Sequence, residues 1–155
     1  MQTLSVAQGT FTLARYPENK RDSLRAWDAA DEYLLHHLST ESLPATGCRT
    51  LILNDAWGAL STALANAAPW TLSDSFLSHK GTEANLARND RASAAERLLN
   101  SLESPDDSID LLLFKVPKSL SLLEDELYRL RPFLHAQTQI VGAGMVRDVH
   151  TSTLN

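Results

Sequence analysis

Short apolar runs alternate along this chain with segments whose apolar residues recur at helical spacing. The runs at 50–53 and 109–114 show no polar alternation, which is typical of strands buried on both faces of a sheet. Between positions 120 and 134 leucines recur every three or four residues, which predicts an amphipathic helix. Ser121 and Glu124 have the spacing of a capping box near the start of this helix.

Weaker patterns fill the rest of the chain. Residues 10–16 alternate and stop before Pro17, which predicts a short half-buried strand without an evident partner. Apolar residues at helical spacing predict a helix near 24–38. Gly81 weakens the helix expected between 76 and 89, because glycine costs roughly 1 kcal/mol in a helix interior. The other expected elements are a helix near 59–66, strands at 70–73 and 97–102, and a fifth buried strand at 138–143.

Buried strands separated by amphipathic helices predict a Rossmann-like, doubly wound α/β fold, in which helices cover both faces of a parallel sheet. Because each crossover places the next strand alongside, we expect five strands in the order 3-2-1-4-5, with 50–53 as strand 1. Residues 150–155 resemble the start of another helix. Because no further strand follows to close the sheet, we expect the strand at 138–143 to form an uncovered edge. We therefore expect residues 1–155 to be a single domain of a longer protein, truncated after strand 5 and able to self-associate.

Composition narrows the class of protein. Hydrophobic content of 43% and charged content of 21% are ordinary for a globular domain. A net charge of −5 argues against nucleic-acid binding by bulk electrostatics, although a local basic face is still compatible with it. The single cysteine, Cys48, excludes an internal disulfide and any cysteine-based zinc site. With no secretion signal and no apolar run of membrane length, the expected location is the cytoplasm.

The strand at 50–53 runs into a helix where dinucleotide- and S-adenosylmethionine-binding folds place a glycine-rich turn. Only Gly58 is left of that turn, and Ala56 and Trp57 occupy positions where a cofactor would need bare backbone. Trp57 is either an adenine-stacking ring or, more commonly for such a position, a core residue. Degenerate remnants of a cofactor site are Asn54, Asp55, Gly58 and Asp74, the last either a ribose-binding acid or a helix cap.

The strand at 109–114 ends in Lys115-Val116-Pro117-Lys118, where amino-methylating enzymes carry an Asn or Asp, two prolines and an aromatic residue. Methyl transfer to an amine requires acceptors that orient the amine and take its proton, whereas lysine side chains only donate. The two lysines are interpreted either as phosphate contacts at the mouth of an old pocket or as solvated loop charges.

No metal site or activated nucleophile is indicated. The histidines lack a two-ligand spacing joined to carboxylates, so surface positions are their default interpretation, and the serines lack the Gly-x-Ser-x-Gly turn of hydrolases. The histidines are His36, His37, His79, His135 and His150, and the arginines that could form a basic face are Arg88, Arg91, Arg129, Arg131 and Arg147.

Four segments carry a resemblance to a known family: WDAADEYLL (27–35), LILNDAWGALS (51–61), KVPK (115–118) and RDVHTSTL (147–154). In this order they resemble the N-terminal domain of ribosomal RNA large subunit methyltransferase G, which is related to the small-subunit methyltransferase C. The resemblance implies two similar methyltransferase-like domains. It also implies that the C-terminal one binds S-adenosylmethionine and methylates guanine N2, while the N-terminal copy is non-catalytic.

The leading hypothesis is therefore a binding and scaffolding module with no catalytic, cofactor-binding or metal residues of its own. The resemblance implies rRNA and the missing C-terminal catalytic domain as partners, with S-adenosylmethionine bound in that missing domain and no membrane contact. Lys115, Lys118 and Arg147 are the candidate RNA contacts, because all three follow strand ends on one rim of the sheet. The alternative hypothesis is an independent small-molecule enzyme or cofactor-binding Rossmann-like domain, which only Asp74 favours.

Overall fold

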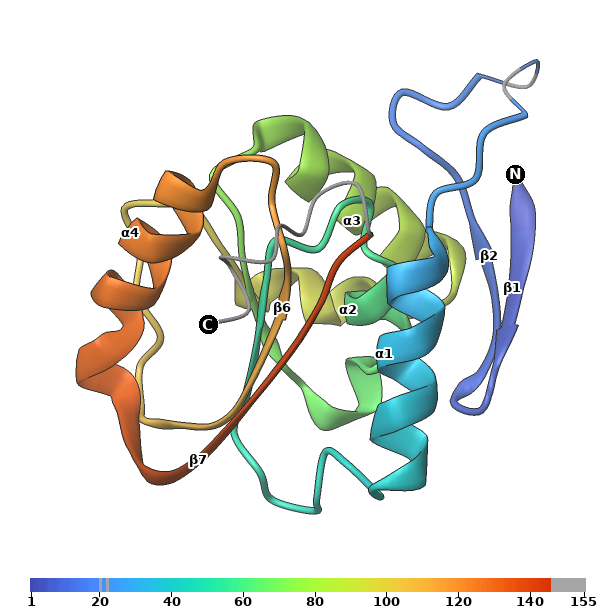
Figure 1. Ribbon diagram of the computed structural model, residues 1–155. Helices are drawn as coiled ribbons and strands as arrows, with labels where there is room; N and C mark the ends of the chain where they lie inside the picture. The colour runs from blue at the N-terminus through green and yellow to red at the C-terminus, as the bar shows by residue number, and fades with distance from the viewer. Residues whose placement is uncertain (20, 22, 146–155) are drawn as a thin grey trace.

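The computed structural model describes residues 1–19, 21 and 23–145. A five-stranded parallel sheet forms its centre (Figure 1), with strands in the order β5-β4-β3-β6-β7. Counted from β3 this is the order 3-2-1-4-5, so the predicted doubly wound topology is confirmed. The strands are β3 (Thr50–Leu53), β4 (Trp70–Leu72), β5 (Leu98–Leu99), β6 (Ile109–Lys115) and β7 (Leu134–Ala143).

Helices lie on both faces of this sheet. Because successive strand side chains point to opposite faces, Ile52 and Leu113 pack towards α1 and α2, whereas Leu53 and Leu112 pack towards α4. In the described part of the chain, no helix is long and apolar enough to cross a membrane. The α-helices are α1 (Ala29–Thr40), α2 (Ala59–Ala63), α3 (Phe76–Arg88) and α4 (Leu120–Leu130), and the 3-10 helices are η1 (Ala65–Ala67), η2 (Ala92–Arg97) and η3 (Arg131–Phe133).

An antiparallel hairpin of β1 (Gln2–Val6) and β2 (Gly9–Leu13) covers the outer side of the helical layer (Figure 1). Leu4 stands opposite Phe11, and both are buried in the core that contains α1 and α2. The strand expected at 10–16 is therefore shorter than predicted. Its partner is a strand that the pattern of polar and apolar residues did not indicate.

Helix α1 begins five residues later than predicted, at Ala29 rather than Leu24, which is 60% exposed. Asp28 sets this start as the N-cap. Its Oδ1 accepts a hydrogen bond from the Asp31 backbone N–H (3.2 Å), and Asp31 Oδ2 accepts one from the Asp28 N–H (3.0 Å). Two donors at the helix start are thereby satisfied reciprocally, which is the geometry of a capping box.

The last helix and strand also correct the predictions. Ser119 caps α4 by accepting a hydrogen bond from the Leu122 N–H (3.2 Å), so the capping box predicted at Ser121 and Glu124 is wrong. Leu134 starts β7 instead of extending the helical stripe. Strand β7 is an edge strand and is mostly exposed, with Ile140 at 52%, so the prediction of a fifth buried strand was also wrong. The helix expected at 150–155 lies outside the described residues.

Candidate functional site at the carboxyl edge of the sheet

The residues that follow β3 and end β6 meet at the carboxyl edge, where the order of strands reverses. In open α/β sheets this is the crevice that binds ligands. Asn54 and Asp55 follow β3, Lys115 ends β6, and the first turn of α1 brings Asp28 and Asp31 to the same place. The structure thus gathers three of the residues singled out in the sequence and adds two carboxylates from α1.

Lys115 points into this cluster and away from solvent. Its Nζ lies 3.1 Å from Asp28 Oδ1 and 3.0 Å from Asp31 Oδ2, and only 11% of its side chain is exposed. The interpretation of Lys115 as a solvated loop charge is therefore wrong. Its two ion pairs also make it unsuited to the phosphate contact that was its other interpretation, because the ammonium already has charged partners in the interior.

The charges of the cluster are strongly coupled. Burial raises the pKa of Asp31 to about 7 against the attraction of Lys115, and the nearby carboxylates of Asp55 and Asp28 add to the rise. Burial would also raise the pKa of Asp28, but Lys115 and two backbone N–H groups bring it below its ordinary value. Burial would lower the pKa of Lys115, yet these carboxylates raise it, so the ammonium stays charged. One internal cation is therefore shared by the buried carboxylate of Asp31 and the half-buried carboxylate of Asp28.

The Asp55 carboxylate accepts hydrogen bonds from backbone N–H groups at the start of α2. Its side chain is buried, and its Oδ2 accepts hydrogen bonds from the Ser61 backbone N–H (2.8 Å) and from Ser61 Oγ (2.7 Å). The Asp55 backbone carbonyl accepts a further bond from Ser78 Oγ of α3 (2.5 Å). N–H groups at a helix start commonly bind anionic ligands, and here a carboxylate of the chain itself occupies them.

Gly58 is retained for packing as well as for its backbone conformation. Its φ is +89°, and a Cβ at this position would lie 2.7 Å from Thr82 Cα of α3. A Cβ at Gly81 would likewise lie 2.7 Å from Trp57 Cε3. The glycine therefore leaves room for the indole ring against α3. Trp57 packs against the hydrophobic core, as predicted, whereas Ala56 is exposed. The turn is built for contact between α2 and α3.

Asn54 turns towards the opposite face of the sheet. Its backbone is left-handed (φ +65°), and its Nδ2 donates to Glu126 Oε1 of α4 over 2.8 Å. Glu126 is 3% exposed, and burial raises its pKa against the hydrogen bond from Asn54, while the charge of Asp74 raises it further. Glu126 was missed in the sequence, although its spacing of three residues from Leu123 places this acid on the buried stripe of α4.

The remaining candidates are spread along the rim. Asp74 is exposed and lines a hollow of about 290 Å³, but it does not cap α3, because Ser75 does so through a hydrogen bond from the Ser78 N–H (3.1 Å). The interpretation of Asp74 as a helix cap is therefore wrong. Lys118 is exposed, as a phosphate contact requires, and Arg147 lies outside the described residues. Among the described residues, no group of three histidines, cysteines or acids is placed to hold a metal ion.

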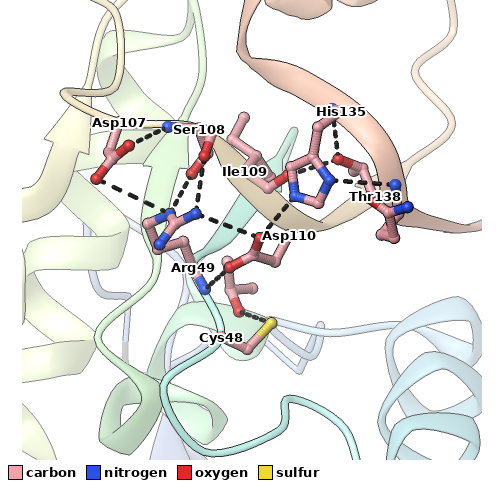
Figure 2. A network of polar contacts seen from close by, with 10 residues as sticks. Cys48, Arg49, Asp107, Ser108, Ile109, Asp110, His135 and Thr138 are labelled. Atoms are coloured by element: carbon pink, nitrogen blue, oxygen red, sulfur yellow. Dashed lines mark hydrogen bonds and ion pairs between the residues drawn. The ribbon is translucent and has the colours of Figure 1, made fainter.

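A separate polar network ties the strands together at the opposite, amino edge (Figure 2). Asp110 of β6 accepts a hydrogen bond from the Arg49 backbone N–H (2.9 Å) and contacts His135 Nε2 of β7 (2.7 Å). His135 Nδ1 accepts from the Gln137 N–H (3.1 Å), so Nε2 carries the proton donated to Asp110. These bonds lower the pKa of Asp110. His135, interpreted from the sequence as a surface histidine, joins β6 to β7.

The fold is that of S-adenosylmethionine-dependent methyltransferases. A putative methyltransferase of this class from Streptococcus mutans superimposes with a TM-score of 0.61 at 16% identity, covering 84% of this chain and 38% of the other. The glycopeptide N-methyltransferase MtfA superimposes with a TM-score of 0.55 at 12% identity, covering 84% and 56%. At such identities the similarity establishes the fold alone.

Sequence similarity identifies the family. The family model described as the RLMG N-terminal domain matches residues 1–155, and the chain belongs to this family. The ribosomal RNA large subunit methyltransferase G of Streptomyces griseus is 51% identical over 159 residues, which cover 99% of this chain and 41% of that protein. The protein of the same name from Erwinia tasmaniensis is 46% identical, covering 99% and 40%. The chain thus spans about 40% of the length of these relatives.

Proposed function

We propose that this chain is the non-catalytic N-terminal domain of an S-adenosylmethionine-dependent rRNA (guanine-N2) methyltransferase. Its role is to help bind the RNA substrate and to scaffold a catalytic domain that lies outside residues 1–155. The names of its relatives support the RNA substrate, and the share of their length that it spans supports a second domain. The residues at the carboxyl edge of the sheet support a non-catalytic role for this domain.

The observation that carries the non-catalytic role is the position of the Lys115 ammonium between Asp28 and Asp31. S-adenosylmethionine carries a sulfonium and an ammonium, so carboxylates at the switch point of the sheet would attract it. Here those carboxylates are already paired with a cation that the chain itself supplies, so a cationic ligand would have to displace the Lys115 ammonium. Asp55 likewise occupies the N–H groups at the start of α2. The residues present do not fit the cofactor.

The loop after β6 also lacks side-chain acceptors for methyl transfer to guanine N2. An amine nucleophile needs acceptor oxygens to orient it and to take its proton. Lys115 and Lys118 supply donors, and the Val116 backbone N–H is bonded to the Ala143 carbonyl at the edge of the sheet (2.9 Å). This loop is therefore a structural connection between β6 and α4.

Isothermal titration calorimetry with S-adenosylmethionine tests the proposal. The chain of residues 1–155 is expected to give no binding heat at cofactor concentrations up to the millimolar range. The full-length enzyme, with its catalytic domain, is expected to bind one equivalent and serves as the positive control. A micromolar dissociation constant for the isolated chain would contradict the non-catalytic role.

A further inference from the structure

Basic residues are concentrated in the segment between β2 and α1. The chain carries a net charge of −5, yet four of its 14 lysines and arginines fall between positions 15 and 25, with two acidic residues among them. Three of the four, Arg15, Arg21 and Arg25, lie in the described part of the chain, and the steps below depend on these three. An acidic protein with a local basic segment has a defined place for a polyanion.

The described acids near this segment pair with Arg25 or with a residue outside the segment. Glu18 pairs with Arg88 of α3 (3.1 Å), so its carboxylate is directed away from the arginines of the segment. Arg25 lies 3.9 Å from Glu32, and its side chain is 54% exposed. Within the described ranges, neither Arg15 nor Arg21 has a carboxylate partner. Arg21 is exposed and Arg15 is half-buried, so a polyanion can approach both side chains.

Hydrogen bonds hold described residues at both ends of this segment. Arg15 Nε donates to the Arg25 carbonyl (3.0 Å), which joins its two ends, and Gln2 Nε2 donates to the Ser23 carbonyl (3.1 Å), which joins it to β1. Lys115 Nζ donates to Asp28 (3.1 Å), the N-cap residue at which the segment enters α1. Figure 1 shows the segment leaving β2 at the end of the molecule where β6 leads into α4.

An exposed aromatic ring accompanies the arginines. Tyr16, beside Arg15, is 38% exposed at this end of the molecule. Arginine binds phosphate oxygens through paired N–H donors, and aromatic rings stack on unpaired bases, so the combination matches single-stranded RNA better than an acidic protein surface. We infer that Arg15, Tyr16, Arg21 and Arg25 form an RNA contact surface, in which the three arginines bind phosphates and Tyr16 stacks on an unpaired base. This inference rests on the RNA-binding part of the proposed function.

In this arrangement Lys115 acts on RNA binding indirectly. Its ammonium fixes Asp28, the residue from which the segment enters α1, and so holds the basic residues in one position. The sequence candidate Lys118 is exposed in the connection between β6 and α4 and is not part of this surface.

Fluorescence anisotropy with a labelled RNA hairpin that carries an unpaired purine loop tests the inference on the chain of residues 1–155. In the variant R15A/R21A/R25A we expect affinity at 100 mM salt to fall about tenfold or more. The slope of log K against log salt should decrease by about 2, because each lost phosphate contact removes roughly 0.7. The matched control K80A/R129A/R131A removes the same charge elsewhere and is expected to stay within about twofold.

Two further variants separate charge from stacking and from misfolding. R15K/R21K/R25K keeps the charge and is expected to retain the salt slope, while Y16A, unlike Y16F, lowers affinity several-fold without changing that slope. Equal losses in R15A/R21A/R25A and in the control, or no loss in either, would overturn the inference and leave the proposed function standing. Failure of the unmodified chain to bind the hairpin at all would contradict both the inference and the RNA-binding part of the proposed function.

Discussion

Lys115 Nζ contacts Asp31 Oδ2 at 3.0 Å and so joins the end of β6 to the first turn of α1, across 84 positions of sequence. Asp31 is 1% exposed and Lys115 is 9% exposed. A buried ion pair contributes little by itself, but the loss of one partner leaves the other charge uncompensated in a medium of low polarity. The predictions that follow begin with this pair.

Replacing Lys115 by Met is expected to lower the free energy of unfolding by about 3–5 kcal/mol, because Asp28 and Asp31 lose their shared cation. Urea denaturation measures the change. Lys118→Met is the matched control, and since Lys118 is exposed its expected effect is within about 0.5 kcal/mol. Equal effects of the two substitutions would show that the buried ion pairs do not form.

Stability should depend on pH through Asp31. Its pKa is raised to about 7, so between pH 4 and 7 the folded protein retains a proton that the unfolded chain has lost. The stability supplied by that proton is complete below pH 4 and is lost as the pH rises towards 7. Relative to Asp31→Asn, the wild type is therefore expected to lose stability between pH 4.5 and 7.5. A constant difference across this range in urea titrations would refute the raised pKa.

Gly58→Ala is expected to destabilise the fold by at least about 2 kcal/mol. The left-handed backbone costs an L-residue about 1–2 kcal/mol, and the new Cβ would lie 2.7 Å from Thr82 Cα. Gly47→Ala is the control, because Gly47 has a similar φ of +79° and nothing within 4 Å of its added Cβ. The difference between the two in thermal or urea unfolding isolates the packing of α2 against α3. Indistinguishable losses would show that this close approach is relieved without cost.

Asn54 allows the hydrogen bond to Glu126 to be separated from the backbone conformation. Asn54→Gly removes the bond but accepts the φ of +65°, and it is expected to cost about 1–3 kcal/mol, because a buried oxygen of Glu126 loses its partner. Asn54→Ala adds the left-handed penalty of about 1 kcal/mol. Both are measured by urea denaturation, and a smaller loss for the Ala variant than for the Gly variant would contradict this assignment.

Much of the fold followed from local patterns. The buried runs at β3 and β6 and the leucine stripe of α4 were evident without coordinates, because burial on both faces of a sheet or on one face of a helix imposes a periodicity. Strand order then followed from the geometry of the crossovers. The boundaries were less accurate, since Asp28 and Ser119 compete as helix caps with neighbouring polar residues of equal propensity. The hairpin strand β1 was missed because its five residues are too few for a clear alternation of polar and apolar positions.

The sequence by itself determined that the turn after β3 lacks the glycines of a cofactor-binding turn, because the residue type at each position is known without coordinates. It also placed four basic residues between positions 15 and 25. Only the tertiary structure decided which charges are neutralised: Glu18 by Arg88 of α3, and Lys115 by Asp28 and Asp31, across 70 to 87 positions of sequence. Electrostatic pairing depends on distances of a few ångströms in space, and the spacing of residues along the chain carries no record of them.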